Sequence, residues 1–248
     1  MKASIGHLTQ VASQQDRPGT CVVASFLVAE AIDLTGKVAL VAGGTGGIGR
    51  LVVEELRQRG TLVVTTSRSH VDTSNHVAAD LRMPDAARDV VEDVHTSYGR
   101  LDIVVNAMGV VAFGDVTATT PDTVEELFMT NTFAHIFLCT AALPKLSRGG
   151  VVVGISGVIA EQNLPGMAIY GASKSAGRSF DEAFGREARR QGVRVINARP
   201  PHTETGLASR ALAGTAPRFP HGLDPAIVAK RIVDAIAEGE TDLPSTAF

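Results

Sequence analysis

The chain alternates short apolar runs, rich in valine and isoleucine, with segments in which apolar residues recur every three or four positions. Short runs bounded by turn residues are typical of strands that are buried on both faces. They occur at 38–42, 62–66, 76–79, 102–105, 151–155 and 193–198. The segments between them have the spacing of amphipathic helices. The pattern therefore predicts a three-layer, doubly wound α/β fold with a parallel sheet of six or seven strands.

Capping residues and glycines mark the ends of the predicted helices. The first helix follows the glycines near position 47 and stops at Gly60, and the second begins at Pro84 and stops at Gly99. A hydroxyl cap and a proline at 120–121 begin a long helix, and two more helices cover 170–190 and 224–236. Asparagine is unfavourable inside a helix, so Asn131 predicts either a local kink or a residue kept for chemistry.

Two segments do not follow the alternation. Residues 1–32 precede the first predicted strand, and we expect them to be an N-terminal extension whose role the sequence does not show. Residues 202–223 are rich in Gly, Pro, Ala and Thr without a period, which is typical of a loop that covers an active site. We expect one domain over 33–248, because a hydrophobic content of 44% is ample for one large core.

Charge and cysteine content narrow the class of partner. A net charge of -3 and the lack of a basic block argue against nucleic acid and an anionic membrane surface, which leaves a small molecule. Cys21 and Cys139 lie in apolar surroundings and indicate reduced core thiols in a cytoplasmic protein. The seven histidines have no metal-ligand spacing, so no metal is predicted.

The sequence predicts no membrane span, because no apolar run reaches the roughly 18 residues that a membrane helix needs. A small-x-small motif at 29–31 leaves a secretion signal as an alternative. The residues before it carry only Lys2 and Arg17 as positive charges, which disfavours that interpretation.

A glycine-rich turn joins the first strand to the first helix. Gly43, Gly47 and Gly49 allow a tight turn and bring backbone N–H groups close to a pyrophosphate, with the positive end of the helix behind them. A glycine-rich loop without a ligand is the simpler alternative. The strand before the turn and the helix after it favour the dinucleotide-binding turn of a Rossmann fold.

The ends of the next strands predict which dinucleotide binds. Ser67 and Arg68 follow the second strand, where the adenosine ribose is expected. A carboxylate there would suit NAD, whereas a hydroxyl and a guanidinium suit the 2′-phosphate of NADP. A solvated loop arginine is the alternative. Asp80 with Leu81 and the stretch 106–109 end the third and fourth strands, so we predict NADP(H) at this edge of the sheet.

Tyr170 and Lys174 form the candidate catalytic pair. Residues four apart share a helix face, with β-carbons roughly 5–6 Å apart, so an ammonium can stabilise a phenolate there. We expect the cation to lower the pKa of Tyr170 from its usual ~10 toward neutrality, which would make it a usable acid and base. The pair alone is a common accident. Its place after the fifth strand of a cofactor-binding sheet, in a chain with two tyrosines, makes it significant.

Together these residues resemble the short-chain dehydrogenase/reductase family, from about residue 33 to 205. The resemblance implies an oxidoreductase in which the cofactor carries a hydride between nicotinamide and a carbonyl or secondary alcohol. It implies that Tyr170 exchanges a proton with the substrate oxygen, that Lys174 holds the nicotinamide ribose, and that Asn131 holds a water linked to Lys174. The implied cofactor-binding residues are Gly43, Thr45, Gly47, Ile48, Gly49, Ser67, Arg68, Asp80, Leu81, Asn106, Ala107, Gly109, Tyr170, Lys174, Pro200 and Thr203.

The sequence departs from the family at the active-site serine. Gly157 stands at that position, with Ser156 beside it. Alternate strand residues point to opposite faces, so Ser156 is not equivalent by position. Either Ser156 or a water supplies the missing hydrogen-bond donor, or the protein binds NADP with weak or no turnover. Because Tyr170, Lys174 and Asn131 are all present, the sequence favours an enzyme in which Ser156 is catalytic.

Other departures concern the edges of the site. Ala107 and Met108 replace two residues of the family's fourth-strand motif, and Pro201 replaces a glycine. The carboxyl end lacks the family's usual last strand. The resemblance also implies a homodimer or homotetramer that pairs through the helices carrying Asn131 and Tyr170.

The expected partner is a small carbonyl or alcohol substrate in an apolar pocket. The residues that suggest this pocket are Met167, Leu207, Leu212 and Phe219. Aliphatic, steroid and polyketide-like ligands all fit this description.

Overall fold

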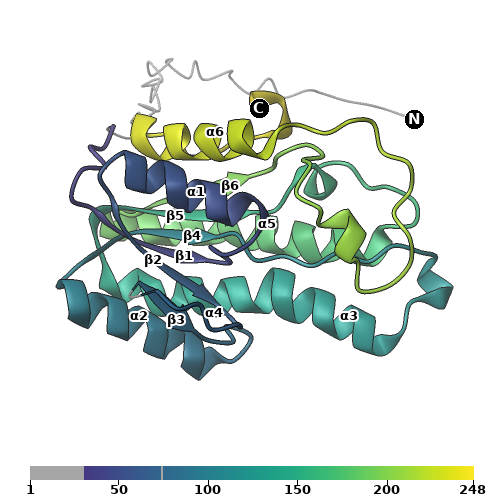
Figure 1. Ribbon diagram of the computed structural model, residues 1–248, viewed down its shortest axis with the longest axis horizontal. Coiled ribbons are helices and arrows are strands. Elements are labelled where there is room, and N and C mark those ends of the chain that lie inside the picture. Colours follow the sequence, from purple (N-terminus) through teal and green to yellow (C-terminus); the bar gives the residue numbers. More distant parts are fainter. Residues whose placement is uncertain (1–30, 74) are drawn as a thin grey trace, which may run out of the picture.

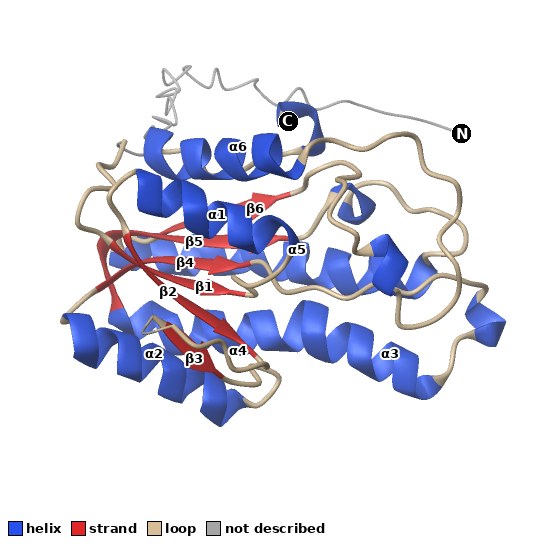
Figure 2. Cartoon of the chain, in the orientation of Figure 1, coloured by secondary structure: helices blue, strands red, loops and turns tan. Residues whose placement is uncertain are grey.

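The computed structural model describes residues 31–73 and 75–248. Cys21, the alternative secretion signal up to residue 30 and all but the last two residues of the expected extension 1–32 lie outside the described residues. Six strands form one parallel sheet in the order β3-β2-β1-β4-β5-β6, which confirms the predicted fold class (Figure 2). The strands are β1 (Val38–Ala42), β2 (Leu62–Ser67), β3 (His76–Ala78), β4 (Leu101–Asn106), β5 (Leu146–Ile155) and β6 (Arg194–Ala198).

Helices cover both faces of the sheet because the strands are apolar on both sides (Figure 1). On one face lie α1 (Gly47–Gln58) and α6 (Pro225–Glu238), and their aliphatic side chains form one buried cluster with the sheet. On the other face, α2 (Pro84–Tyr98), α4 (Ala134–Ala142) and α5 (Ala168–Ala188) form the second cluster. The strand order reverses between β1 and β4, which is where ligands bind in sheets of this type.

The sheet differs from the prediction mainly at its last strands. β5 begins at Leu146, five residues earlier than predicted, because the chain passes through Gly149 at φ 85° and still pairs with β4 after a register shift. A seventh strand is reduced to one bridge between Ala198 and Leu243. The carboxyl end of the chain thus contributes one parallel bridge to the sheet, where the family usually has a full last strand.

The predicted irregularity at Asn131 is confirmed as a π-helical turn over Met129–Phe133, between α3 (Pro121–Phe128) and α4. The whole helical stretch Pro121–Lys145 is long and apolar enough to cross a membrane by length and composition, so the expectation that no apolar stretch reaches that length is wrong. Half of its most apolar window is buried inside the fold, and the core helix of a folded domain meets the same criterion.

Candidate active site

The glycine turn after β1 forms a cradle that side chains would fill. Gly43 has φ 73°, and a Cβ there would lie 2.9 Å from the Ala107 carbonyl carbon. A Cβ on Gly49 would lie 2.2 Å from the Gly43 oxygen. Gly46 precedes α1 at the N-cap position and has no side chain, so no N-cap side chain accepts from the first N–H groups of the helix. Such a cradle fits a pyrophosphate.

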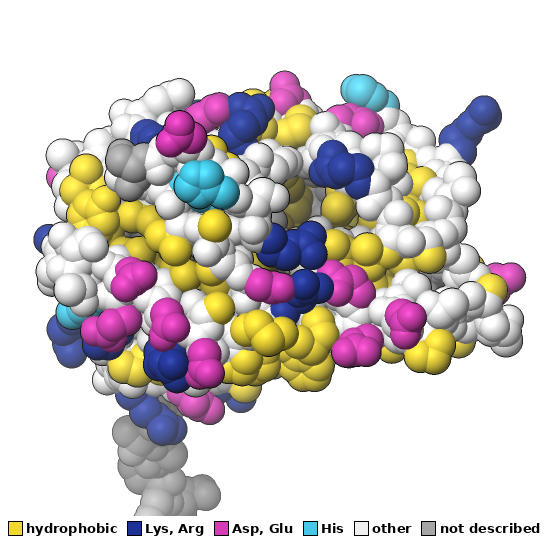
Figure 3. Space-filling view, turned by 60° about the horizontal axis from the view of Figure 1, so that its bottom comes forward, with side chains coloured by type: hydrophobic (Ala, Val, Ile, Leu, Met, Phe, Trp, Pro, Cys, Tyr) yellow, Lys and Arg dark blue, Asp and Glu magenta, His cyan; other side chains and the backbone are white. Residues whose placement is uncertain are grey.

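A hollow of about 710 Å³ extends from this cradle along the carboxyl ends of the strands (Figure 3). Every predicted cofactor-binding residue lines it except Gly49, which packs behind the turn, and Asn106, which lies deeper. Thr66 also lines the hollow, and its hydroxyl is buried. It is the one buried side-chain polar atom without a hydrogen-bond partner in the part of the chain that the structure describes. The glycine cradle and the uncapped helix end together fit a dinucleotide.

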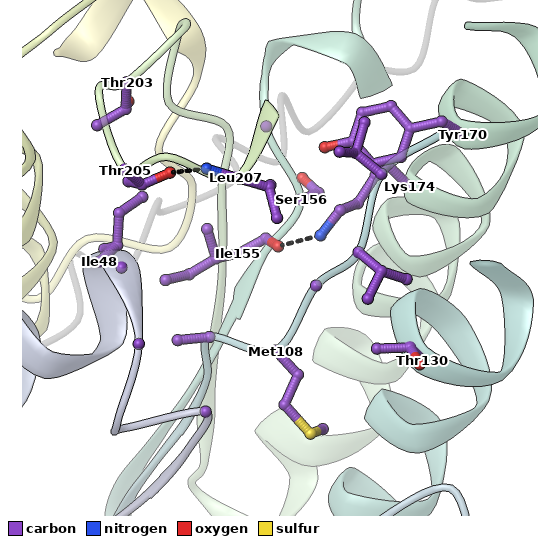
Figure 4. A pocket seen from close by; sticks show the side chains of 18 of the residues that line it. Ile48, Met108, Thr130, Ile155, Ser156, Tyr170, Lys174, Thr203, Thr205 and Leu207 are labelled. Atoms are coloured by element: carbon purple, nitrogen blue, oxygen red, sulfur yellow. Dashed lines mark hydrogen bonds between the residues drawn. The ribbon is translucent and has the colours of Figure 1, made fainter. Parts of the chain in front are cut away.

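Tyr170 and Lys174 lie on one face of α5 at the other end of the hollow (Figure 4). The Lys174 ammonium donates to the Ile155 carbonyl at 3.1 Å. Burial raises the pKa of Tyr170 to about 12 and lowers the pKa of Lys174 to about 8. The expected lowering of the tyrosine pKa is therefore wrong for this structure, because burial dominates and Lys174 is held at the strand end.

Asn131 lies behind the hollow rather than in it. Its side-chain oxygen accepts from the Val110 N–H at 2.9 Å, and its amide donates to the Val110 carbonyl and to Ser173. A cavity of about 10 Å³ separates Asn131 from Lys174, close to the lower limit for one water. The side chain thus fixes the chain after β4 to α5, and the predicted water stays a prediction.

Ser156 does not offer its proton to the hollow, contrary to its predicted catalytic role. Its hydroxyl donates to Asn197 Oδ1 at 2.7 Å. The orientation of this amide is set on both sides, because Asn197 Nδ2 donates to the Asp181 carboxylate and Arg199 donates to Asn197 Oδ1. The hydrogen bond to Asn197 therefore holds the Ser156 proton away from a substrate.

Gly157 adopts φ 107°, a region that L-residues rarely populate. The nearest atom to a Cβ there is the Pro200 oxygen, at 3.8 Å. Space is thus available for a serine side chain, but the backbone conformation disfavours it. The backbone conformation at position 157 therefore favours glycine over the serine that the family has there.

A buried polar network that the sequence analysis missed continues from Asn197. Asp181 pairs with His135 at 2.6 Å, and His135 also contacts Cys139 at 3.7 Å. These three residues are the group of possible metal ligands found within the described residues, and hydrogen bonds among them already use their polar atoms. Burial lowers the pKa of His135, but the charge of Asp181 outweighs this and holds it well above its usual value. The sequence signal for this network was the presence of His135 and Asp181 on the otherwise apolar faces of their helices.

Four charged groups gather at the end of the hollow beside β2 and β3, which we call the adenosine end because the sequence predicts the adenosine there, and two of the four were identified from the sequence. Arg68 is exposed, with 61% of its side chain accessible, and its Nη1 lies 3.8 Å from Glu126 Oε1. Arg82 donates to Asp80 through Nε and Nη2 and contacts Glu126 through Nη1. Ser67 donates its proton to the Ser69 carbonyl. Arg82 and Glu126 were missed because they lie 44 positions apart in the sequence.

The end of the hollow beside Tyr170 is apolar. Phe113, Ile159, Met167 and Phe219 belong to a third buried cluster, next to Tyr170. The rings of Phe113 and Phe219 lie 6.1 Å apart. Leu207 also lines the hollow, whereas Leu212, which was predicted to do so, is exposed. Residues of the predicted loop 202–223 thus form one wall of the site (Figure 4).

Comparison with known proteins agrees with this geometry. The short chain dehydrogenase family matches residues 37–215. The chain is 31% identical over 222 residues to a hydroxynaphthalene reductase of Aspergillus fumigatus, covering 84% of this chain and 80% of that protein. It is 32% identical over 166 residues to a tetrahydroxynaphthalene reductase of Pyricularia oryzae, covering 61% of this chain and 59% of that one.

Solved structures give the same result. A short-chain dehydrogenase from Streptomyces avermitilis superposes with a TM-score of 0.75 and 27% identity, covering 86% of this chain and 90% of that one. A short chain dehydrogenase from Burkholderia cenocepacia in complex with NADP superposes with a TM-score of 0.73 at 24% identity, covering 86% and 98%. The chain belongs to the short-chain dehydrogenase/reductase family and is an oxidoreductase.

Proposed function

We propose that this protein is an NADP(H)-dependent reductase of carbonyl compounds, with Tyr170 as the proton donor. The observation that carries the proposal is the pairing of a glycine cradle and Arg68 at one end of the hollow with a buried Tyr170 at the other. NADP(H) supplies the hydride when it is bound. The glycine turn and α1 would hold the pyrophosphate, Arg68 the 2′-phosphate, and Lys174 the nicotinamide ribose.

The state of Tyr170 supports reduction as the working direction. A phenol whose pKa is raised to about 12 is protonated at neutral pH, so it is ready to donate a proton to a developing alkoxide. Oxidation would need Tyr170 to lose its proton first, so that the phenolate could accept one from the alcohol, and burial disfavours the phenolate. Lys174, with its pKa lowered to about 8, remains mostly cationic at pH 7, and it would stabilise the phenolate that forms once its ammonium leaves the Ile155 carbonyl.

We propose flat, fused-ring carbonyl compounds as the substrate class. The walls beside Tyr170 are apolar and include two aromatic rings, with His202 stacked on Phe219 at 4.8 Å. Such walls favour a planar apolar ligand. Two relatives are named as reductases of hydroxynaphthalene and tetrahydroxynaphthalene, which are fused-ring compounds.

The alternative is a protein that binds NADP(H) with weak or no turnover. Gly157 and the hydrogen bond from Ser156 to Asn197 favour it, because neither residue offers a donor to the substrate oxygen. In other enzymes, loss of such a hydrogen-bond donor lowers the rate by about 10²–10³.

For the reductase, we propose that a water or a residue of 202–223 donates the hydrogen bond to the substrate oxygen.

The deciding experiment follows NADPH absorbance with a panel of fused-ring ketones, quinones, aliphatic ketones and steroids. We expect substrate-dependent oxidation with the fused-ring members and its loss in Tyr170→Phe, which should still bind NADPH. NADPH binding without oxidation of any panel member would support the binding protein. Turnover that survives Tyr170→Phe would refute the role of Tyr170.

A further inference from the structure

The four charged side chains at the adenosine end come from three separate parts of the chain. Arg68 follows β2, Asp80 and Arg82 follow β3, and Glu126 lies on α3. Arg68, Asp80 and Arg82 line the hollow, whereas Glu126 lies behind them. Basic and acidic side chains alternate beside the hollow on the surface (Figure 3). The positive charge available to an anion at this end is therefore set by contacts within the protein.

Glu126 is bound on several sides. Its carboxylate contacts Arg82 Nη1 at 2.5 Å, lies 3.8 Å from Arg68 Nη1 and accepts a hydrogen bond from Thr130 at 3.0 Å. Thr130 belongs to the π-helical turn, so the carboxylate is anchored to its own helix. Only 27% of the Glu126 side chain is accessible, which limits screening by solvent.

Arg82 has little capacity left for a ligand. Its Nε and Nη2 donate to Asp80 and its Nη1 to Glu126, so three of its five N–H groups face carboxylates. Asp80 and Glu126 together neutralise Arg82 and oppose Arg68. Arg68 has no hydrogen bond to Glu126, because 3.8 Å is too long, and is held near it by charge alone.

We propose that Glu126 is a specificity-determining residue that limits the affinity for the 2′-phosphate of NADP(H). The inference rests on the proposed NADP(H) function. A carboxylate behind Arg68 and Arg82 reduces the positive potential that a dianionic phosphate meets, and it competes for Arg68. NADH lacks this phosphate, so Glu126 should have little effect on NADH binding.

The test compares Glu126→Gln with the native protein by fluorescence titration with NADPH and with NADH, which needs no turnover. Glutamine keeps the size and the acceptor for Thr130 but removes the charge. We expect NADPH to bind about two- to fivefold more tightly and NADH to be unchanged, the size of effect measured for partly exposed ion pairs. The gain should shrink at high salt.

Glu125→Gln is the matched control, since Glu125 is the exposed neighbour on the same helix and its loss changes the net charge equally. Tighter NADPH binding in Glu126→Gln alone supports the proposal. The proposal would be overturned if Glu126→Gln left the NADPH affinity unchanged or lowered it. It would also be overturned if the affinities for NADPH and NADH rose equally, or if Glu125→Gln had the same effect. A native protein that binds NADH as tightly as NADPH would refute the NADP(H) assignment itself, which the same titrations reveal first.

Discussion

Replacing His135 with leucine should destabilise the fold strongly, because it leaves the Asp181 carboxylate buried without its cation. The two side chains are 3% and 2% accessible and their charged atoms lie 2.6 Å apart. After the change, Asp181 would keep only the hydrogen bond from Asn197. Removing one partner of a buried pair costs about 3–5 kcal/mol, a large part of a typical unfolding free energy of about 5–15 kcal/mol.

The assay is urea unfolding and thermal melting at one fixed protein concentration. For a chain of this size, a loss of 3–5 kcal/mol corresponds to a fall in Tm of about 6–20 °C. The control is His135→Leu combined with Asp181→Asn, which removes the buried charge and should recover at least about 1 kcal/mol. A single variant within 1 kcal/mol of native, or a double variant no better than the single one, would refute the reasoning.

The same pair predicts how stability depends on pH. The pKa of His135 is raised well above its unfolded value of 6.5, so its contribution is fully present below pH 6.5 and is lost as pH rises through the folded-state pKa. The free energy of unfolding of native protein should therefore fall with rising pH above neutrality. His135→Gln, which cannot carry the charge, should lack this part of the slope. Parallel slopes in the two proteins would contradict the assignment.

Four further predictions concern the site and the assembly. Arg68→Ala should abolish any preference for NADPH over NADH in fluorescence titrations. Ser156→Ala should change kcat by less than about threefold, because the Ser156 proton is held by Asn197; a collapse of kcat would show that Ser156 does donate. Gly157→Ser should lower the unfolding free energy by about 1–3 kcal/mol without raising turnover, because φ 107° with ψ 163° is a conformation that essentially only glycine adopts. Sedimentation should give a dimer or tetramer, because Phe133 is exposed, stacks on Phe137 and offers an apolar surface for a second copy of the chain. A 25.9 kDa species at micromolar concentration would contradict this.

The sequence predicted the parts of the molecule that depend on local pattern. The strands are short apolar runs and the helices have caps and glycine stops, so most elements could be placed within a few residues. The ends of parallel strands meet at one edge, so the residues after β1, β2, β3 and β4 were expected together and are found lining one hollow. A local kink at Asn131 was one of two predicted alternatives, because asparagine is a poor helix residue, but the π-helical form of the turn was not predicted.

Features that depend on distant pairs could not be predicted in the same way. The contact between Arg82 and Glu126 and the pair of His135 with Asp181 join residues 44 and 46 positions apart. Helix spacing indicated that Tyr170 and Lys174 share a face, but it gave neither their burial nor the direction of the long lysine side chain. Those two properties, rather than proximity, decide the pKa of Tyr170.

Some polar groups around the hollow already form hydrogen bonds within the protein, and others do not. This difference determines which groups can contribute to the free energy of cofactor binding. Ser156 donates to Asn197, Lys174 to the Ile155 carbonyl, and Arg82 to two carboxylates. A ligand at any of these groups exchanges one hydrogen bond for another, which contributes little net free energy. Arg68 and the uncapped start of α1 are not engaged in this way. Cofactor affinity and the choice between NADP(H) and NAD(H) should therefore depend mainly on the N-terminus of α1 and on Arg68. Glu126 should lower the positive potential around Arg68.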